Sequence, residues 1–273
     1  MKIRKIDWMW QGILAIILIL IFASPIYVLV GVALKSPSDM SSMWVLPSYI
    51  NIENFTVAIN EGKILLSMIN SLIITFVTVI LIVFAGAFAS YPLARINTHL
   101  NKFVKAFTLG IMIVPPLSIL VPLYATLVNI GGVDSYWGIV LTLLTFELPL
   151  SIYLYTNFVS SIPKALDEAG SIDGCGPIRT FFSIILPQLK PVTASVIILA
   201  GVHCWNDYQF SLYILQNPEY KTVTLAISSF FSQTTSNLNA AAASALLAIL
   251  PITLVFLFLQ KYFIKGMVDS AIK

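Results

Sequence analysis

Two acidic residues stand in stretches of the sequence that are otherwise apolar, Glu147 in "FELPLS" and Asp207 in "HCWNDYQF". An ionisable side chain is costly to place inside a membrane, so such a residue marks a candidate functional site. Trp205 and Asn206 precede Asp207, and Tyr208 follows it. Carboxylates, amides and aromatic rings bind sugars through hydroxyl hydrogen bonds and ring stacking. These five residues are therefore the candidate pathway residues.

Other roles for these residues stay open. Polar side chains in a membrane also bond between helices, and for Asp207 we slightly favour that structural role. A metal site at His203 and Cys204 is disfavoured, because adjacent helical residues point about 100° apart and further ligands are missing. A proton relay has little support from two acids and one histidine. Cys175 and Cys204 form no CxxC pair, so we interpret both as small space-filling residues.

A polar loop, Glu168–Pro191, interrupts the apolar pattern with "EAGSIDGCGPIRTFFSIILPQLKP". Its surroundings predict a first helix over Pro163–Ser171, a turn at Gly174 with positive φ, and a second helix that begins at Pro177 and stops before Pro187. The first helix has a polar side and an apolar side. It could dock against a partner or rest on lipid headgroups, and periodicity leaves both open.

The composition is that of an all-α polytopic membrane protein. The 273 residues are 58% hydrophobic and 10% charged, and the mean hydropathy is +0.92. Soluble domains carry about 25% charged residues. The pI near 8.8 could suggest nucleic acid, but the charges fall in short runs between apolar segments, so we expect no nucleic-acid partner.

Six apolar segments are long enough to cross a bilayer, which takes about 20 residues. They are Gly12–Leu34, Ile64–Ala89, Phe107–Val128, Tyr136–Val159, Val192–Leu215 and Ala240–Phe263. The first follows a basic start, as a signal peptide does, but its apolar run is too long for one, and we expect a retained span. Prolines inside several spans predict kinks.

The basic residues predict the orientation of these spans. Twelve Lys and Arg residues fall at the two termini and in the loops between spans two and three and between spans four and five, against three in the other loops. Positive charge favours the cytoplasmic side, so both termini and the polar loop are predicted to be cytoplasmic. The segments Lys35–Lys63 and Gln216–Asn239 are then external.

The polar loop resembles the EAA loop of permease subunits of importer-type ABC transporters. That pattern is Glu-Ala-Ala, three residues, Gly, nine residues, then Ile-x-Leu-Pro. This chain has Glu168, Ala169 and Gly170, then Gly174, and ends the pattern with Leu186 and Pro187. Only Gly170 departs, since the family usually has alanine there. "NSLIITF", "YPLARI", "WNDYQFSLYIL" and the C-terminal "LPITLVFLFLQKYFIKG" extend the resemblance, which is to carbohydrate permeases of the maltose G type, over nearly the whole chain.

The resemblance implies a type I ABC importer permease fold, with one transmembrane permease domain (1–273), a cytoplasmic coupling loop at 161–190 and a cytoplasmic tail at 264–273. It implies a heterodimer with a second homologous permease, two ABC ATPase subunits and an extracytoplasmic sugar-binding protein in a prokaryotic plasma (inner) membrane. The chain has no GxxxxGK[ST] phosphate loop. We therefore expect no enzyme activity and no cofactor on this chain, with ATP and Mg bound by the partner ATPases.

The resemblance also implies roles for the loop residues. The first loop helix would be the coupling helix that enters a cleft in the ATPase. Glu168 would contact the ATPase, Ala169 and Gly170 would allow close approach, and Gly174 would form the turn. The predicted coupling residues are Asp167, Glu168, Ala169, Gly170, Asp173, Gly174, Leu186 and Pro187. The tail from Lys265 and the last external loop would contact the ATPase and the binding protein respectively.

The predicted function is import of a sugar, with an oligosaccharide favoured, by alternating access driven by the partner ATPase. In the maltose system the partner permease makes most sugar contacts, so direct contact by this chain stays open. Another solute of the same family, such as glycerol phosphate, would favour cationic groups along the pathway, and the interiors of the predicted spans show none. A secondary transporter or membrane enzyme would show inverted repeats or a catalytic cluster, and we find neither.

Overall fold

The computed structural model describes residues 5–231 and 237–271, with side chains described over 10–231, 237–258 and at 260. Every regular element in these ranges is a helix, which confirms the predicted all-α class. The chain divides into two compact units. Unit 1 combines Met1–Leu65 with Ala226–Leu250, and unit 2 combines Leu66–Leu225 with Pro251–Lys273. The single permease domain over 1–273 stays a prediction.

Apolar helices dominate both units. In the described residues, four helices are long and apolar enough to cross a membrane: α1 (Lys5–Leu34), α3 (Ile64–Arg95), α6 (Tyr136–Ser161) and α13 (Leu238–Ala271). Two bent pairs of helices raise the number to as many as six if each pair forms one span. They are α4 (His99–Ile111) with Pro116–Asn129, bent by 96°, and Pro177–Gln188 with α10 (Lys190–Trp205), bent by 74°.

Two predicted spans are not continuous helices. Within Phe107–Val128, helix α4 ends at Ile111 and is followed by η1 (Pro116–Ile119) and α5 (Leu120–Asn129). The pair Pro115–Pro116 explains this break, because each proline removes a backbone donor and disfavours helix in the residue before it.

The second interrupted span is Val192–Leu215, where α10 ends at Trp205 and α11 (Gln209–Ile214) follows. The Asn206 amide donates to the Val202 carbonyl at 2.9 Å. Such a side-chain bond competes with the helix ladder. The predicted span Val192–Leu215 is thus interrupted after Trp205.

In unit 1, polar side chains bind the end of α1. Asn54 of α2 (Glu53–Asn60) donates its amide to the Ala33 and Lys35 carbonyls at 2.8 and 2.7 Å. Asn239, at the start of α13, donates to the Val32 and Lys35 carbonyls at 2.9 and 3.0 Å. The last carbonyls of a helix lack partners within the helix. The two amides donate hydrogen bonds to these carbonyls, which holds the C-terminal end of α1 in place.

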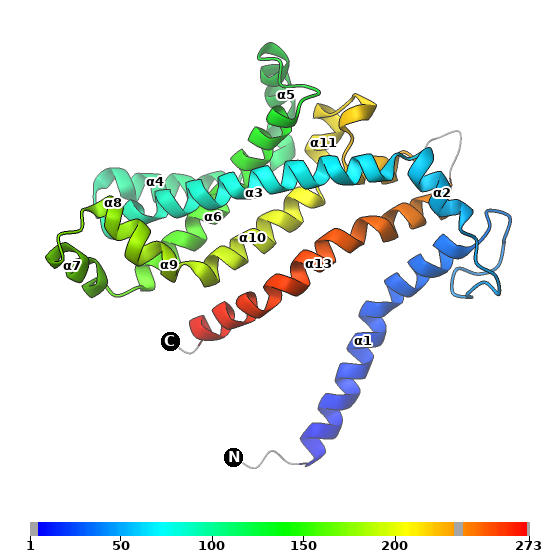
Figure 1. Cartoon of the computed structure of the whole chain (residues 1–273), viewed down its shortest axis with the longest axis horizontal. Coiled ribbons are helices and arrows are strands. Elements are labelled where there is room, and N and C mark those ends of the chain that lie inside the picture. The colour runs from blue at the N-terminus through cyan, green and yellow to red at the C-terminus, as the bar shows by residue number, and fades with distance from the viewer. Residues whose placement is uncertain (1–4, 232–236, 272–273) are drawn as a thin grey trace. The chain divides into compact units, whose positions relative to one another are not determined.

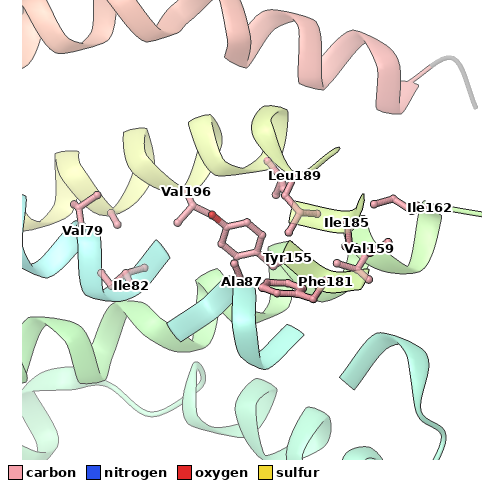
Figure 2. Close-up of a cluster of buried hydrophobic side chains, with 12 residues drawn as sticks. Val79, Ile82, Ala87, Tyr155, Val159, Ile162, Phe181, Ile185, Leu189 and Val196 are labelled. Carbon is pink, nitrogen blue, oxygen red and sulfur yellow. The ribbon is translucent and has the colours of Figure 1, made fainter. Parts of the chain in front are cut away.

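The core of unit 2 lies between α3, α6, α10 and the polar loop (Figure 2). Tyr155 of α6 is fully buried among these elements, and its hydroxyl donates to Thr193 of α10 at 2.9 Å. Gly86 of α3 faces Ser151 of α6 so closely that an added Cβ would overlap the serine hydroxyl. Small residues at such positions let membrane helices approach each other.

The polar loop folds into α7 (Ala165–Ile172), α8 (Pro177–Thr180), the π-helical turn η2 (Phe181–Ile185) and α9 (Leu186–Gln188), with α7 at its outer tip in Figure 1. The predicted order of helix, glycine turn and helix is confirmed. The predicted stop before Pro187 is wrong, because the second arm continues to Gln188. The Leu186 N–H donates to the Phe181 carbonyl, five residues back. This wider turn accommodates Pro187, which has no N–H to donate.

Candidate functional site

The turn of the polar loop depends on one glycine. Gly174 has φ of +77°, a value that glycine adopts without steric cost. Its N–H donates to the Ser171 carbonyl at 3.1 Å, and the Cys175 N–H donates to the Gly170 carbonyl at 2.9 Å. This pair of bonds is the Schellman ending of α7. The turn predicted at Gly174 is therefore present.

Gly170 is the point where the two arms of the loop meet. It is buried, and an added Cβ would lie 2.7 Å from Ile184 Cδ1 and 3.3 Å from Thr180 Oγ1. Both neighbours belong to the second arm of the same chain. The absence of a side chain at Gly170 therefore lets α7 pack closely on the second arm.

The outer side of the loop exposes acidic and apolar side chains together. Glu168 and Ala169 are exposed on α7. Ile172 is 86% exposed and Ile178 of α8 is 67% exposed. Large apolar side chains exposed on a polar loop are a feature of protein interaction sites. Asp173 and Pro187 are also exposed, while Leu186 packs against the core of unit 2.

Asp167 has a different environment from its neighbour Glu168. The Tyr91 hydroxyl donates to Asp167 Oδ1 at 2.7 Å, and Arg95 Nη2 lies 2.9 Å from Asp167 Oδ2. Arg95 Nη1 also donates to the Ile162 carbonyl at 3.0 Å. Our sequence analysis gave Tyr91 and Arg95 no role of their own. The structure places them, at the end of α3, beside the polar loop.

Among the candidate pathway residues, Asp207 has clear structural partners. Its carboxylate accepts from the Ser211 N–H at 2.9 Å and the Ser211 hydroxyl at 2.6 Å. It also accepts from the Phe210 N–H at 3.3 Å. The Thr224 hydroxyl donates to the Asp207 carbonyl at 2.6 Å. The carboxylate therefore caps the first turn of α11, a local role that differs from the bond between helices that sequence analysis considered.

Glu147 and His203 form a pair that sequence analysis missed. His203 Nδ1 of α10 lies 3.1 Å from both carboxylate oxygens of Glu147 on α6. The histidine side chain is 56% exposed and the glutamate 16%. The sequence offered one signal for this pair, since each residue is a polar group within an apolar stretch.

Polar residues in and just after the last turn of α10 line one shallow recess of about 460 Å³, formed with Val202 and Gln209. They are His203, Asn206, Asp207 and Tyr208. Trp205 is not among them, because it is 3% exposed and faces an apolar pocket between α3, α10 and the later part of α13. The five candidate residues thus separate into a recess, a buried tryptophan and the Glu147–His203 pair.

The side chains described offer no metal site. No group of three or more His, Cys, Asp or Glu side chains among them could hold an ion. Cys175 is half-buried and Cys204 is buried, and both are free.

The chain belongs to the family described as "binding-protein-dependent transport system inner membrane component", whose model matches residues 82–269. It is 43% identical to the melibiose/raffinose/stachyose import permease protein MelC of Bacillus subtilis (strain 168), over 91% of each chain. It is 31% identical to the maltodextrin transport system permease protein MdxG of the same organism, over 86% of this chain and 83% of that protein.

A solved structure with a similar fold belongs to a bacterial ABC transporter that imports the acidic polysaccharide alginate. The TM-score is 0.78 at 19% identity, and the match covers 96% of this chain and 98% of that one. The chain therefore has the type I importer permease fold that sequence analysis predicted. It is a membrane transport component with several spans rather than an enzyme, and its family works with an ATPase and a binding protein.

Proposed function

We propose that this chain is one of two homologous permease subunits of an ABC importer that moves an oligosaccharide into the cytoplasm by alternating access. The observation that carries the proposal is the coupling loop. Its two packed arms present Glu168, Ala169 and Ile172 on an exposed tip. A rigid tip of this kind suits a cleft in a partner that closes when ATP binds.

The proposed assembly contains two permease chains and two ATPases, with a binding protein on the opposite side of the membrane. Both termini and the coupling loop lie in the cytoplasm, as the distribution of Lys and Arg predicts. ATP and Mg belong to the ATPases. The tail at 264–273 is proposed to reach the ATPase pair. Its side chains lie outside the described residues, as does the middle of the external loop Gln216–Asn239 that we expect to face the binding protein.

An oligosaccharide is the proposed substrate because the relatives MelC and MdxG are named for melibiose, raffinose, stachyose and maltodextrin. The recess with Asn206 and Tyr208 offers an amide and an aromatic ring to such a solute. In this proposal the Glu147–His203 pair lies along the pathway, and Asp207 positions the recess by capping α11.

Affinity purification of the tagged chain from native membranes tests the proposal. We expect an ABC ATPase and a second permease of the same family to purify with it, and a deletion strain to lose uptake of raffinose or melibiose. Glycerol 3-phosphate uptake serves as the matched control and should not change. A chain that purifies without an ATPase, or a deletion that abolishes only glycerol phosphate uptake, would refute the proposal.

A further inference from the structure

We propose that Tyr91, Arg95 and Asp167 form a lock that transmits movement of the coupling helix α7 into the membrane helices α3 and α6. The inference rests on the proposed function and adds positioning residues to it. The term "Arg95 lock" denotes these three side chains together with the Ile162 carbonyl. They are contributed by α3, by α7 and by the residue that ends α6.

The charged half of the lock joins α3 to α7. Arg95 Nη2 lies 2.9 Å from Asp167 Oδ2, and the Tyr91 hydroxyl donates to Asp167 Oδ1 at 2.7 Å. The two side chains of the ion pair are 9% and 20% exposed. Solvent screens the attraction between two charges less when they are shielded in this way than when they lie on the surface. Hydrogen bonds to a charged group are also stronger than hydrogen bonds between neutral groups. Asp167 Oδ1 thus accepts a hydrogen bond from α3, and Oδ2 lies at ion-pair distance from Arg95 of the same helix.

The same guanidinium also holds α6. Arg95 Nη1 donates to the carbonyl of Ile162 at 3.0 Å, and Ile162 is the C-cap of α6. The last carbonyls of a helix have no partner within the helix. One planar side chain therefore ties the ends of two membrane helices to the coupling helix.

Aromatic contacts attach the second arm of the loop to the same face of α3. The Phe181 ring lies 5.5 Å from the ring of Tyr91 and 5.7 Å from that of Phe88. Phe88, Tyr91 and Arg95 are three and four residues apart, so they share one face of the helix. Both arms of the loop are thus bound to the last two turns of α3, and Gly170 packs them against each other.

The neighbouring acids Asp167 and Glu168 therefore have different roles. Asp167 faces this chain's own helices, while Glu168 is exposed on α7. A force applied to the exposed face of α7 reaches α3 and α6 through three polar contacts and one aromatic cluster. Because these contacts join packed elements, the loop and the helix ends move as one body. The Arg95 lock positions α7 and transmits its movement to α3 and α6, and it does not touch the substrate.

The test uses the purified wild-type complex and three variants, Arg95→Gln, Asp167→Asn and Tyr91→Phe. We expect each complex to assemble, and we expect Arg95→Gln and Tyr91→Phe to keep their basal ATPase activity. The stimulation by raffinose-loaded binding protein should fall about tenfold in the first two variants and less in the third, since removing one partner of a shielded pair leaves the other charge unpaired. The double variant Arg95→Gln with Asp167→Asn should be no worse than either single variant, as expected for one shared interaction.

Lys102→Gln is the matched control, because it removes one exposed cation from α4 on the same side of the membrane. Its stimulated activity should equal that of the wild type. Hydrogen exchange of the loop amides in the same samples should be faster in Arg95→Gln than in the control.

Three results would overturn the lock. The first is normal stimulation in Arg95→Gln and Asp167→Asn. The second is loss of the ATPase from the Asp167→Asn complex alone, because Asp167 would then contact the ATPase directly. The third is loss of assembly in all three variants, because the cluster would then serve folding only. A wild-type chain that purifies without any ATPase would instead refute the proposed function.

Discussion

Replacing Gly174 tests whether the loop must be rigid to couple. At φ of +77° this residue occupies the left-handed region, and nothing lies within 4 Å of an added Cβ. The cost of Gly174→Ala is therefore backbone strain alone, about 1–2 kcal/mol. Gly174→Pro adds a forbidden φ and removes the N–H that donates to the Ser171 carbonyl, for a total of about 3 kcal/mol or more.

Hydrogen exchange of the Cys175 amide measures this change in the stability of the turn directly. The Cys175 N–H is bonded to the Gly170 carbonyl at 2.9 Å, so it exchanges when the turn opens. A cost of 1–2 kcal/mol raises the open fraction about 5- to 30-fold, and Cys175 protection in Gly174→Ala should fall by that factor. Uptake of raffinose should fall further in Gly174→Pro, while the amount of protein in the membrane stays constant.

Gly176 provides the matched control for this series. It has φ of −70° and ψ of 165°, and no atom lies within 4 Å of an added Cβ. Gly176→Ala should therefore change the opening free energy by less than about 0.5 kcal/mol. Equal Cys175 protection in Gly174→Ala and Gly176→Ala, or wild-type uptake by Gly174→Pro, would refute the reasoning.

Three further predictions concern other parts of the chain. Gly170→Ala should be tolerated, because the flexible end of Ile184 can move, Thr180 Oγ1 must shift by only a few tenths of an ångström, and alanine favours helix by up to about 1 kcal/mol. Gly170→Leu should lower the ATPase content of the purified complex, and an unchanged content would contradict the packing. Asp207→Ala should lower the free energy of unfolding by about 1 kcal/mol, because the cap on α11 is lost. The thermal midpoint of the complex should fall, while its affinity for raffinose-loaded binding protein should not change. A changed affinity would make Asp207 a pathway residue. Hydrogen bonds from Ser41 lower the pKa of Asp39 from its ordinary value of 3.8 to about 2. Its stabilisation of the segment Lys35–Lys63 is therefore present above about pH 3.8 and is lost as the pH falls towards 2. A fluorescence titration of Trp44 should show this transition, and Asp39→Asn should abolish it.

The local features of the loop were predictable from sequence. A helix start, a glycine and a second start predicted the arms and the positive φ at Gly174, because a turn depends on residues next to each other. The continuation through Pro187 was not predictable in this way, since it depends on a π turn that forms within the packed loop.

The long-range pairs were beyond sequence analysis. Arg95 and Asp167 are 72 residues apart, and Glu147 and His203 are 56 apart. Only the packing of α3, α6, α7 and α10 brings each pair together. Asp207 shows the intermediate case, in which the residue was singled out correctly as polar in an apolar stretch. The choice between cap and ligand required the positions of Phe210 and Ser211.

The central claim is that this chain forms part of a sugar pathway driven by a partner ATPase. The most direct test is raffinose accumulation in proteoliposomes that contain the purified complex, with the binding protein on the side opposite the ATPases. The account predicts accumulation only when ATP is on the ATPase side and the binding protein is present, and its loss in Gly174→Pro. Accumulation driven by an ion gradient in the absence of ATP would contradict it.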